Sequence, residues 1–167
     1  GRRGLRAGDV RRARSDARRY PAIEPLESWS KYPSIIDKAR MERLRKILRH
    51  GNDVAQMMKV VGEEGTGIAD FTSYLKGEFL DAVYLQQNAF IDVDAATPAE
   101  RQRDMFGIVE KAMLAEYPFK DKGAARNFFQ VLTQACVDWN MTASDQPEYV
   151  TRRDAIAKTV EENARHA

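Results

Sequence analysis

Three adjacent carboxamides beside an aromatic ring form the stretch of this sequence best suited to recognition chemistry. Residues 84–90 are Tyr-Leu-Gln-Gln-Asn-Ala-Phe. Amides offer paired hydrogen-bond donors and acceptors, and a ring offers a stacking face. Gln87 and Asn88 could bind the edge of a nucleobase while Phe90, next to Ala89, covers its ring. The residues alone favour the alternative that the amides pair with the last carbonyls of a helix and the ring anchors a loop in the core.

The motifs of common catalytic sites are missing from the sequence. There is no phosphate-binding GxxxxGK[ST] loop and no GxSxG elbow. Gly62–Gly67 contains glycines but also two glutamates, which would repel phosphate, so it predicts a helix–helix turn. Asp92 and Asp94 lack the further ligands of a calcium loop. We therefore expect no catalytic residue and no metal ligand.

Cysteine use and charge bound the protein class. The single cysteine, Cys136, allows no internal disulfide, fits a reducing cytoplasm and is expected in the core. The net charge of +2 hides an asymmetry, because residues 1–19 carry eight arginines and two aspartates, and so +6, which leaves −4 for the remainder. Such an arm could bind nucleic acid or an acidic protein, or be a solvated terminal flank. No apolar run reaches the ~18 residues of a membrane span.

The chain divides into three parts. Residues 1–19 are the basic arm or junction, residues 20–33 an irregular segment of interleaved prolines and aromatic residues, and residues 34–167 a helical bundle domain. Since no segment alternates with a period of two residues, we predict an all-α fold of five to six helices.

Helix boundaries follow from caps and apolar periodicity. One helix begins at Ser34 and ends at Gly51, and a second, 52–61, buries four residues. A third helix spans about 68–87. A fourth begins at Thr97-Pro98-Ala99-Glu100 and ends before Pro118. A fifth begins near Lys122 and a last one at Asp145-Gln146-Pro147. The apolar residues expected inside the second helix are Val54, Met57, Met58 and Val61.

Three ordered motifs carry a family resemblance. Residues 84–90 with Asp92-Val93-Asp94, residues 17–23 (Ala-Arg-Arg-Tyr-Pro-Ala-Ile) with Trp29-Ser30-Lys31-Tyr32, and residues 57–62 (Met-Met-Lys-Val-Val-Gly) resemble stretches of one family. It is the C-terminal domain of the catalytic A subunit, or alpha chain, of V-type and archaeal-type rotary ATPases.

The resemblance implies one domain of a larger machine. The family's phosphate-loop domain has no counterpart here, so the chain alone should not hydrolyse ATP, and ATP or ADP with Mg would belong to the parent subunit. The residues matching Phe90 and Ala89 border the adenine pocket in the family, with Asn88 and Gln87 beside them. The expected partners are the non-catalytic B subunits, the central stalk and the missing nucleotide-binding domain.

The same resemblance implies a role in ATP-driven or ATP-synthesising transport of protons or sodium. The family's helical domains face the shaft and shift as rigid bodies, and the Gly62–Gly67 loop and charged helix ends are candidates for that face. The expected location is cytoplasmic, peripheral to the membrane and not inserted in it. The alternative is a free-standing helical module whose arginine-rich arm binds nucleic acid or an acidic protein. Nucleic acid is not the partner that we expect.

Overall fold

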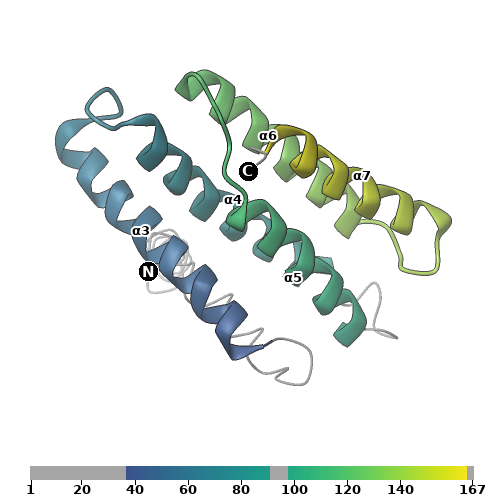
Figure 1. The fold of residues 1–167 in the computed structure, drawn as a ribbon. Coiled ribbons are helices and arrows are strands. Elements are labelled where there is room, and N and C mark those ends of the chain that lie inside the picture. Colours follow the sequence, from purple (N-terminus) through teal and green to yellow (C-terminus); the bar gives the residue numbers. More distant parts are fainter. Residues whose placement is uncertain (1–36, 91–97, 165–167) are drawn as a thin grey trace, which may run out of the picture.

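The computed structural model describes residues 37–90 and 98–164, without the side chains of residues 84–90, 98, 99 and 102. The predicted arm (1–19), the proline-containing segment (20–33) and the loop residues Asp92 and Asp94 lie outside the described residues. The regular elements of the described part are all α-helices, as predicted, and Figure 1 shows their arrangement. Its helices are α3 (Lys38–Val61), α4 (Ile68–Phe90), α5 (Pro98–Leu114), α6 (Lys122–Asn140) and α7 (Pro147–Asn163).

Helix α4 is the centre of the bundle. It packs against α3 on one side and α6 on another, and it also contacts α5, while α7 covers α5 and α6. Apolar residues recur along α4 with a helical period, so the helix buries one face from its first turn. The buried residues of this face are Phe71, Leu75, Phe79, Leu80 and Val83.

Local capping signals explain where the helices begin. The Asp37 side chain accepts a hydrogen bond from the Ala39 amide at the start of α3. The Asp121 side chain accepts one from the Ala124 amide at the start of α6. Pro147 occupies the first turn of α7, where its missing N–H is not needed. The predicted beginnings near Lys122 and at Pro147 are therefore confirmed.

Gly51 does not end a helix, contrary to the prediction. Helix α3 runs unbroken from Lys38 to Val61 and Gly51 is buried in its middle. A Cβ atom at Gly51 would lie 2.7 Å from the backbone oxygen of Ser73 in α4. The glycine is needed because the two helix backbones approach each other closely there, not because the chain turns.

Met57 is also not in the core, contrary to the prediction. Its side chain is 40% exposed, and Val61 is 49% exposed, whereas Val54 is buried and Met58 is only partly buried against the core. The apolar periodicity of α3 continues to its end, but no described helix covers that face there. The interior sides of α5 and α6 agree with the predicted pattern, and Cys136 is buried as expected.

An aromatic cluster joins the coil after α5 to α4 and α6. Tyr117 lies 4.8 Å from Phe128 and 5.6 Å from Phe129 between ring centroids, and Phe79 of α4 lies 6.1 Å from Phe129. Such ring pairs stabilise a core beyond the area that they bury. The cluster fixes the start of α6 beside α4.

Candidate functional site

The C-terminal end of α3 carries the most exposed large apolar side chain of the described residues. Val60 is 85% exposed, and with Met57 and Val61 it leaves three neighbouring apolar side chains in solvent at the end of α3. We call Met57, Val60, Val61 and the loop 62–67 the tip. Scattered apolar residues are common on surfaces, but clustered ones at the end of a helical hairpin indicate a contact surface.

The loop within the tip has a fixed shape. Gly62 has a φ of 76°, in the left-handed region that disfavours other residues, and its N–H donates to the Met58 carbonyl. Thr66 is 2% exposed, and its hydroxyl donates to the Gly62 carbonyl at 3.0 Å. A Cβ atom on Gly65 would lie 2.7 Å from the Val61 oxygen. The helix–helix turn predicted from the glycines is therefore confirmed.

Two cations of α6 hold this loop from outside the hairpin. The Arg126 guanidinium donates to the Glu63 carboxylate, and the Lys122 ammonium donates to the Glu63 carbonyl. Both cations also lie over the ring of Phe71 in the first turn of α4, at 5.1 Å for Arg126 and 5.9 Å for Lys122. No sequence motif indicates these contacts, because Glu63 and Arg126 are far apart in the chain.

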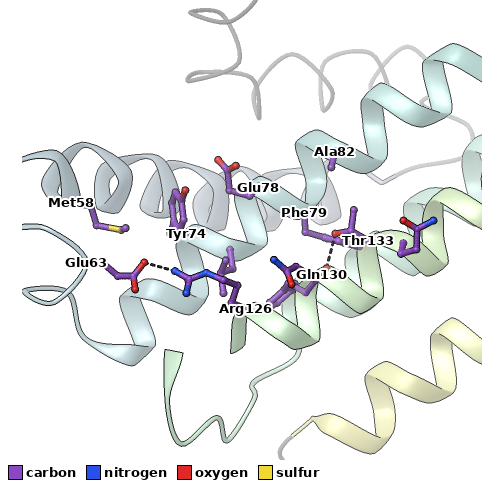
Figure 2. A pocket seen from close by; sticks show the side chains of 12 residues that line it. Met58, Glu63, Tyr74, Glu78, Phe79, Ala82, Arg126, Gln130 and Thr133 are labelled. Carbon is purple, nitrogen blue, oxygen red and sulfur yellow. Dashed lines mark hydrogen bonds and ion pairs between the residues drawn. The ribbon is translucent and has the colours of Figure 1, made fainter. Parts of the chain in front are cut away.

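A groove of about 430 Å³ runs beside the tip between α4 and α6. Figure 2 shows Glu63 and Arg126 meeting at one end, Met58 and Tyr74 nearby, and Phe79 and Thr133 further along. Burial, then the Glu78 charge, raises the pKa of Tyr74, so this phenol stays neutral.

Several polar side chains of the groove are engaged in hydrogen bonds or ion pairs within the bundle. The Thr133 hydroxyl donates to the Phe129 carbonyl, Gln134 donates to Asp138, and Glu63 is paired with Arg126. A nucleophile needs an adjacent base and an oriented third group, and the groove lining offers no such set. Within residues 37–90 and 98–164, no group of three His, Cys, Asp or Glu residues could hold a metal ion.

The predicted adenine-bordering residues lie at the other end of α4. The helix extends to Phe90, three residues beyond the predicted end at Gln87, so the backbone of 87–90 is helical. The side chains of Gln87, Asn88, Ala89 and Phe90 lie outside the described residues. Their contact with a nucleobase remains a prediction.

A buried arginine secures the opposite end of the bundle from the tip. Arg101 in the first turn of α5 is 5% exposed, and it donates to the carbonyls of Asn140 and Thr142 at 2.5 and 2.9 Å. Its guanidinium also lies 5.3 Å from the Tyr149 ring centroid. Arg101 thereby joins α5 to the C-terminal end of α6 and to α7, a contact that no sequence motif predicted.

No described helix is both long and apolar enough to cross a membrane. No solved structure matches the chain significantly.

Comparison with known proteins identifies the family. The sequence model for the C-terminal domain of V and A type ATP synthase matches residues 38–121. The chain is 47% identical over 153 residues to the V-type ATP synthase alpha chain of Treponema denticola, covering 92% of this chain and 26% of that one. It is 52% identical over 149 residues to the alpha chain of Borreliella afzelii, covering 89% of this chain and 26% of that one. The chain spans about a quarter of the length of the curated relatives that it matches. The match runs from the first residue of α3 to the residue before α6, and the chain belongs to the family of C-terminal domains of V and A type ATP synthases.

Proposed function

We propose that this chain is the C-terminal helical domain of the catalytic alpha subunit of a V/A-type rotary ATP synthase and couples nucleotide state to the central stalk. The parent subunit would bind ATP or ADP with Mg on its nucleotide-binding domain, next to non-catalytic B subunits. The complex would transport protons or sodium from a cytoplasmic position peripheral to the membrane. Residues 1–19 and 20–33 would connect the bundle 34–167 to the nucleotide-binding domain.

One observation carries this proposal: a single uninterrupted helix joins the two ends that the function needs. Helix α4 begins directly after the tip loop and ends at Phe90. At 1.5 Å per residue, a helix of 23 residues is about 34 Å long. A displacement at the nucleotide end would therefore reach the tip as a rigid-body movement, which is a known means of coupling distant sites.

The tip is the surface that we assign to the shaft. Val60, Met57 and Val61 are exposed in this chain and would be buried against a partner. Burying an aliphatic side chain of this size contributes about 1.5–3 kcal/mol. Contact with the shaft would explain why apolar side chains are exposed at the C-terminal end of α3.

The experiment compares one substitution at two exposed valines. In a rotary complex whose catalytic subunit ends in this chain, Val60→Asp should weaken shaft binding at least about tenfold and lower ion transport per ATP hydrolysed. Val150→Asp on α7 is the matched control, since Val150 is also exposed, at 46%, but lies away from the tip. Equal shaft binding and coupling in both variants would refute the assignment of the tip.

The nucleotide end has its own test. If Phe90 stacks on adenine, Phe90→Ala should lose about 1–3 kcal/mol of nucleotide affinity in the same complex, and Phe90→Tyr should retain most of it. Unchanged nucleotide affinity in Phe90→Ala would remove the adenine contact but leave the tip assignment standing. The relatives do not favour the alternative of a free-standing nucleic-acid-binding module. The similar proteins named above are V-type ATP synthase alpha chains.

A further inference from the structure

Helix α6 begins with two cations where a helix dipole disfavours them. Lys122 and Arg126 lie in the first two turns of α6, and its first turn contains no acidic residue. The N-terminal end of a helix carries a partial positive charge, so cations are unfavourable there unless another group compensates. The N-cap residue Asp121 supplies one compensating carboxylate. The tip supplies a second, because the Glu63 carboxylate accepts from Arg126 and the Glu63 carbonyl accepts from Lys122.

These contacts fasten the loop and the first turn of α4 together. Arg126 pairs with the Glu63 carboxylate while its guanidinium covers Phe71, which is fully buried in α4. Lys122 reaches the Glu63 backbone oxygen, so it holds the main chain of the loop. Figure 2 shows the Glu63 side chain directed at Arg126 across the mouth of the groove. The tip is thus held by α6 as well as by its own turn.

The far end of α6 is fastened too. The carbonyls of Asn140 and Thr142 accept hydrogen bonds from Arg101 of α5. Helix α5 begins at the end of the bundle where α4 finishes (Figure 1). The 19 residues of α6 span about 28 Å, and the helix packs along α4. A movement at the end of α4 would therefore be shared by α6 through Arg101 and by the tip through Lys122 and Arg126.

We propose that Arg126 and Lys122 are positioning residues that fix the orientation of the tip through Glu63, so that α6 transmits movement beside α4. This inference rests on the proposed function, because it concerns how the tip is presented to the shaft. It adds α6, which lies beyond the residues 38–121 matched by the family, to the coupling path.

The first experiment measures the fastening itself and does not depend on the shaft. The Thr66 amide reports on the loop, because it donates to the Glu63 carbonyl and so closes the turn. In the 167-residue chain, Arg126→Glu should speed hydrogen exchange of this amide by about three- to fivefold. The expected effect is small because an exposed ion pair contributes at most about 1 kcal/mol. The charge-swapped double variant, Glu63→Arg with Arg126→Glu, should restore slow exchange. Unchanged exchange in Arg126→Glu would overturn the proposal.

The second experiment measures coupling in the rotary complex. Arg126→Glu should lower ion transport per ATP hydrolysed at least twofold without changing the KM for ATP, and the double variant should recover most of the loss. The matched control is Lys111→Glu, which breaks the Lys111–Glu161 pair between α5 and α7, also exposed and away from the tip. Equal coupling losses in the two single variants would indicate general destabilisation and overturn the positioning role.

The outcomes separate this inference from the proposed function. If Val60→Asp impairs coupling and Arg126→Glu does not, the tip contacts the shaft but α6 does not position it, and the inference fails alone. If Val60→Asp has no effect, the assignment of the tip to the shaft fails, while the exchange measurement still tests the fastening.

Discussion

Replacing Gly51 by alanine tests whether close contact between α3 and α4 sets the geometry of the bundle. Alanine favours a helix interior over glycine by about 1 kcal/mol, so helix propensity alone predicts a more stable protein. The new Cβ atom would, however, lie 2.7 Å from the Ser73 oxygen and 3.4 Å from the Ser73 carbonyl carbon. These are backbone atoms, which cannot rotate away as the end of a side chain can. The two helices must therefore separate.

The expected magnitude follows from these opposing effects. Overpacking a core costs up to about 3 kcal/mol, and the propensity gain offsets about 1 kcal/mol of it. We expect Gly51→Ala to lower the free energy of unfolding by about 2 kcal/mol. For a chain of this size, each kcal/mol shifts Tm by about 2–4 °C, so Tm should fall by about 4–8 °C.

Gly77→Ala is the matched control in the neighbouring helix. A Cβ atom at Gly77, inside α4, meets no described atom within 4 Å. Only the propensity term remains, so this variant should gain up to about 1 kcal/mol. Thermal and urea unfolding followed by circular dichroism measure both variants. If Gly51→Ala is as stable as the unchanged chain or more so, the close approach of the helices is not what requires glycine.

Three further predictions concern the rest of the bundle. Arg101→Met should lose about 3 kcal/mol of stability in urea unfolding, because two buried carbonyls lose their donor, and Arg101→Lys should lose less. Stability should fall as pH rises above 9.0, because burial raises the pKa of the Cys136 thiol to about 12 and also raises the pKa of the Tyr117 hydroxyl. Above pH 9.0 only the unfolded chain releases these protons, which favours unfolding. In urea denaturation at increasing pH, Cys136→Ala should make this decline in stability shallower. Gly62→Ala should lower Tm through strain of about 1–3 kcal/mol, because a φ of 76° with a ψ of 170° is a conformation that essentially only glycine adopts, and Gly62→Asn should lower it by a similar amount.

Local features of the fold were predictable because they depend on residues close in sequence. The beginnings of α6 and α7 and the glycine turn 62–67 are of this kind, and all three match the structure. Gly51 could not be assigned in the same way. In α3 the same residue type ends the helix at Gly62 and permits a close crossing at Gly51, and only Ser73, from α4, distinguishes the two.

The candidate site was predictable only in part for the same reason. The apolar period of α3 correctly places Val54 inside but cannot tell that the bundle stops short of Met57. Periodicity defines a face of a helix, whereas exposure depends on whether another helix reaches that face. The Glu63–Arg126 pair is equally non-local, so the fastening of the tip has no sequence signature. The nucleobase contact of Phe90 stays a prediction from the motif.

The rigid transmission that we propose for this domain would require more of the chain than the family match covers. Residues 38–121 include α3, α4 and α5 but end just before α6. The buried ring of Phe79 on α4 packs against Phe129 of α6, so without α6 the central helix would expose an apolar face along its length. A helix packed on one side only bends and frays more readily than one packed on both, because most helical stability in proteins comes from tertiary contacts. Helix α6 also holds the tip at its N-terminal end and is itself held by Arg101 at its C-terminal end. In the proposed function it would therefore be as necessary as α4 for a displacement to cross the bundle undiminished.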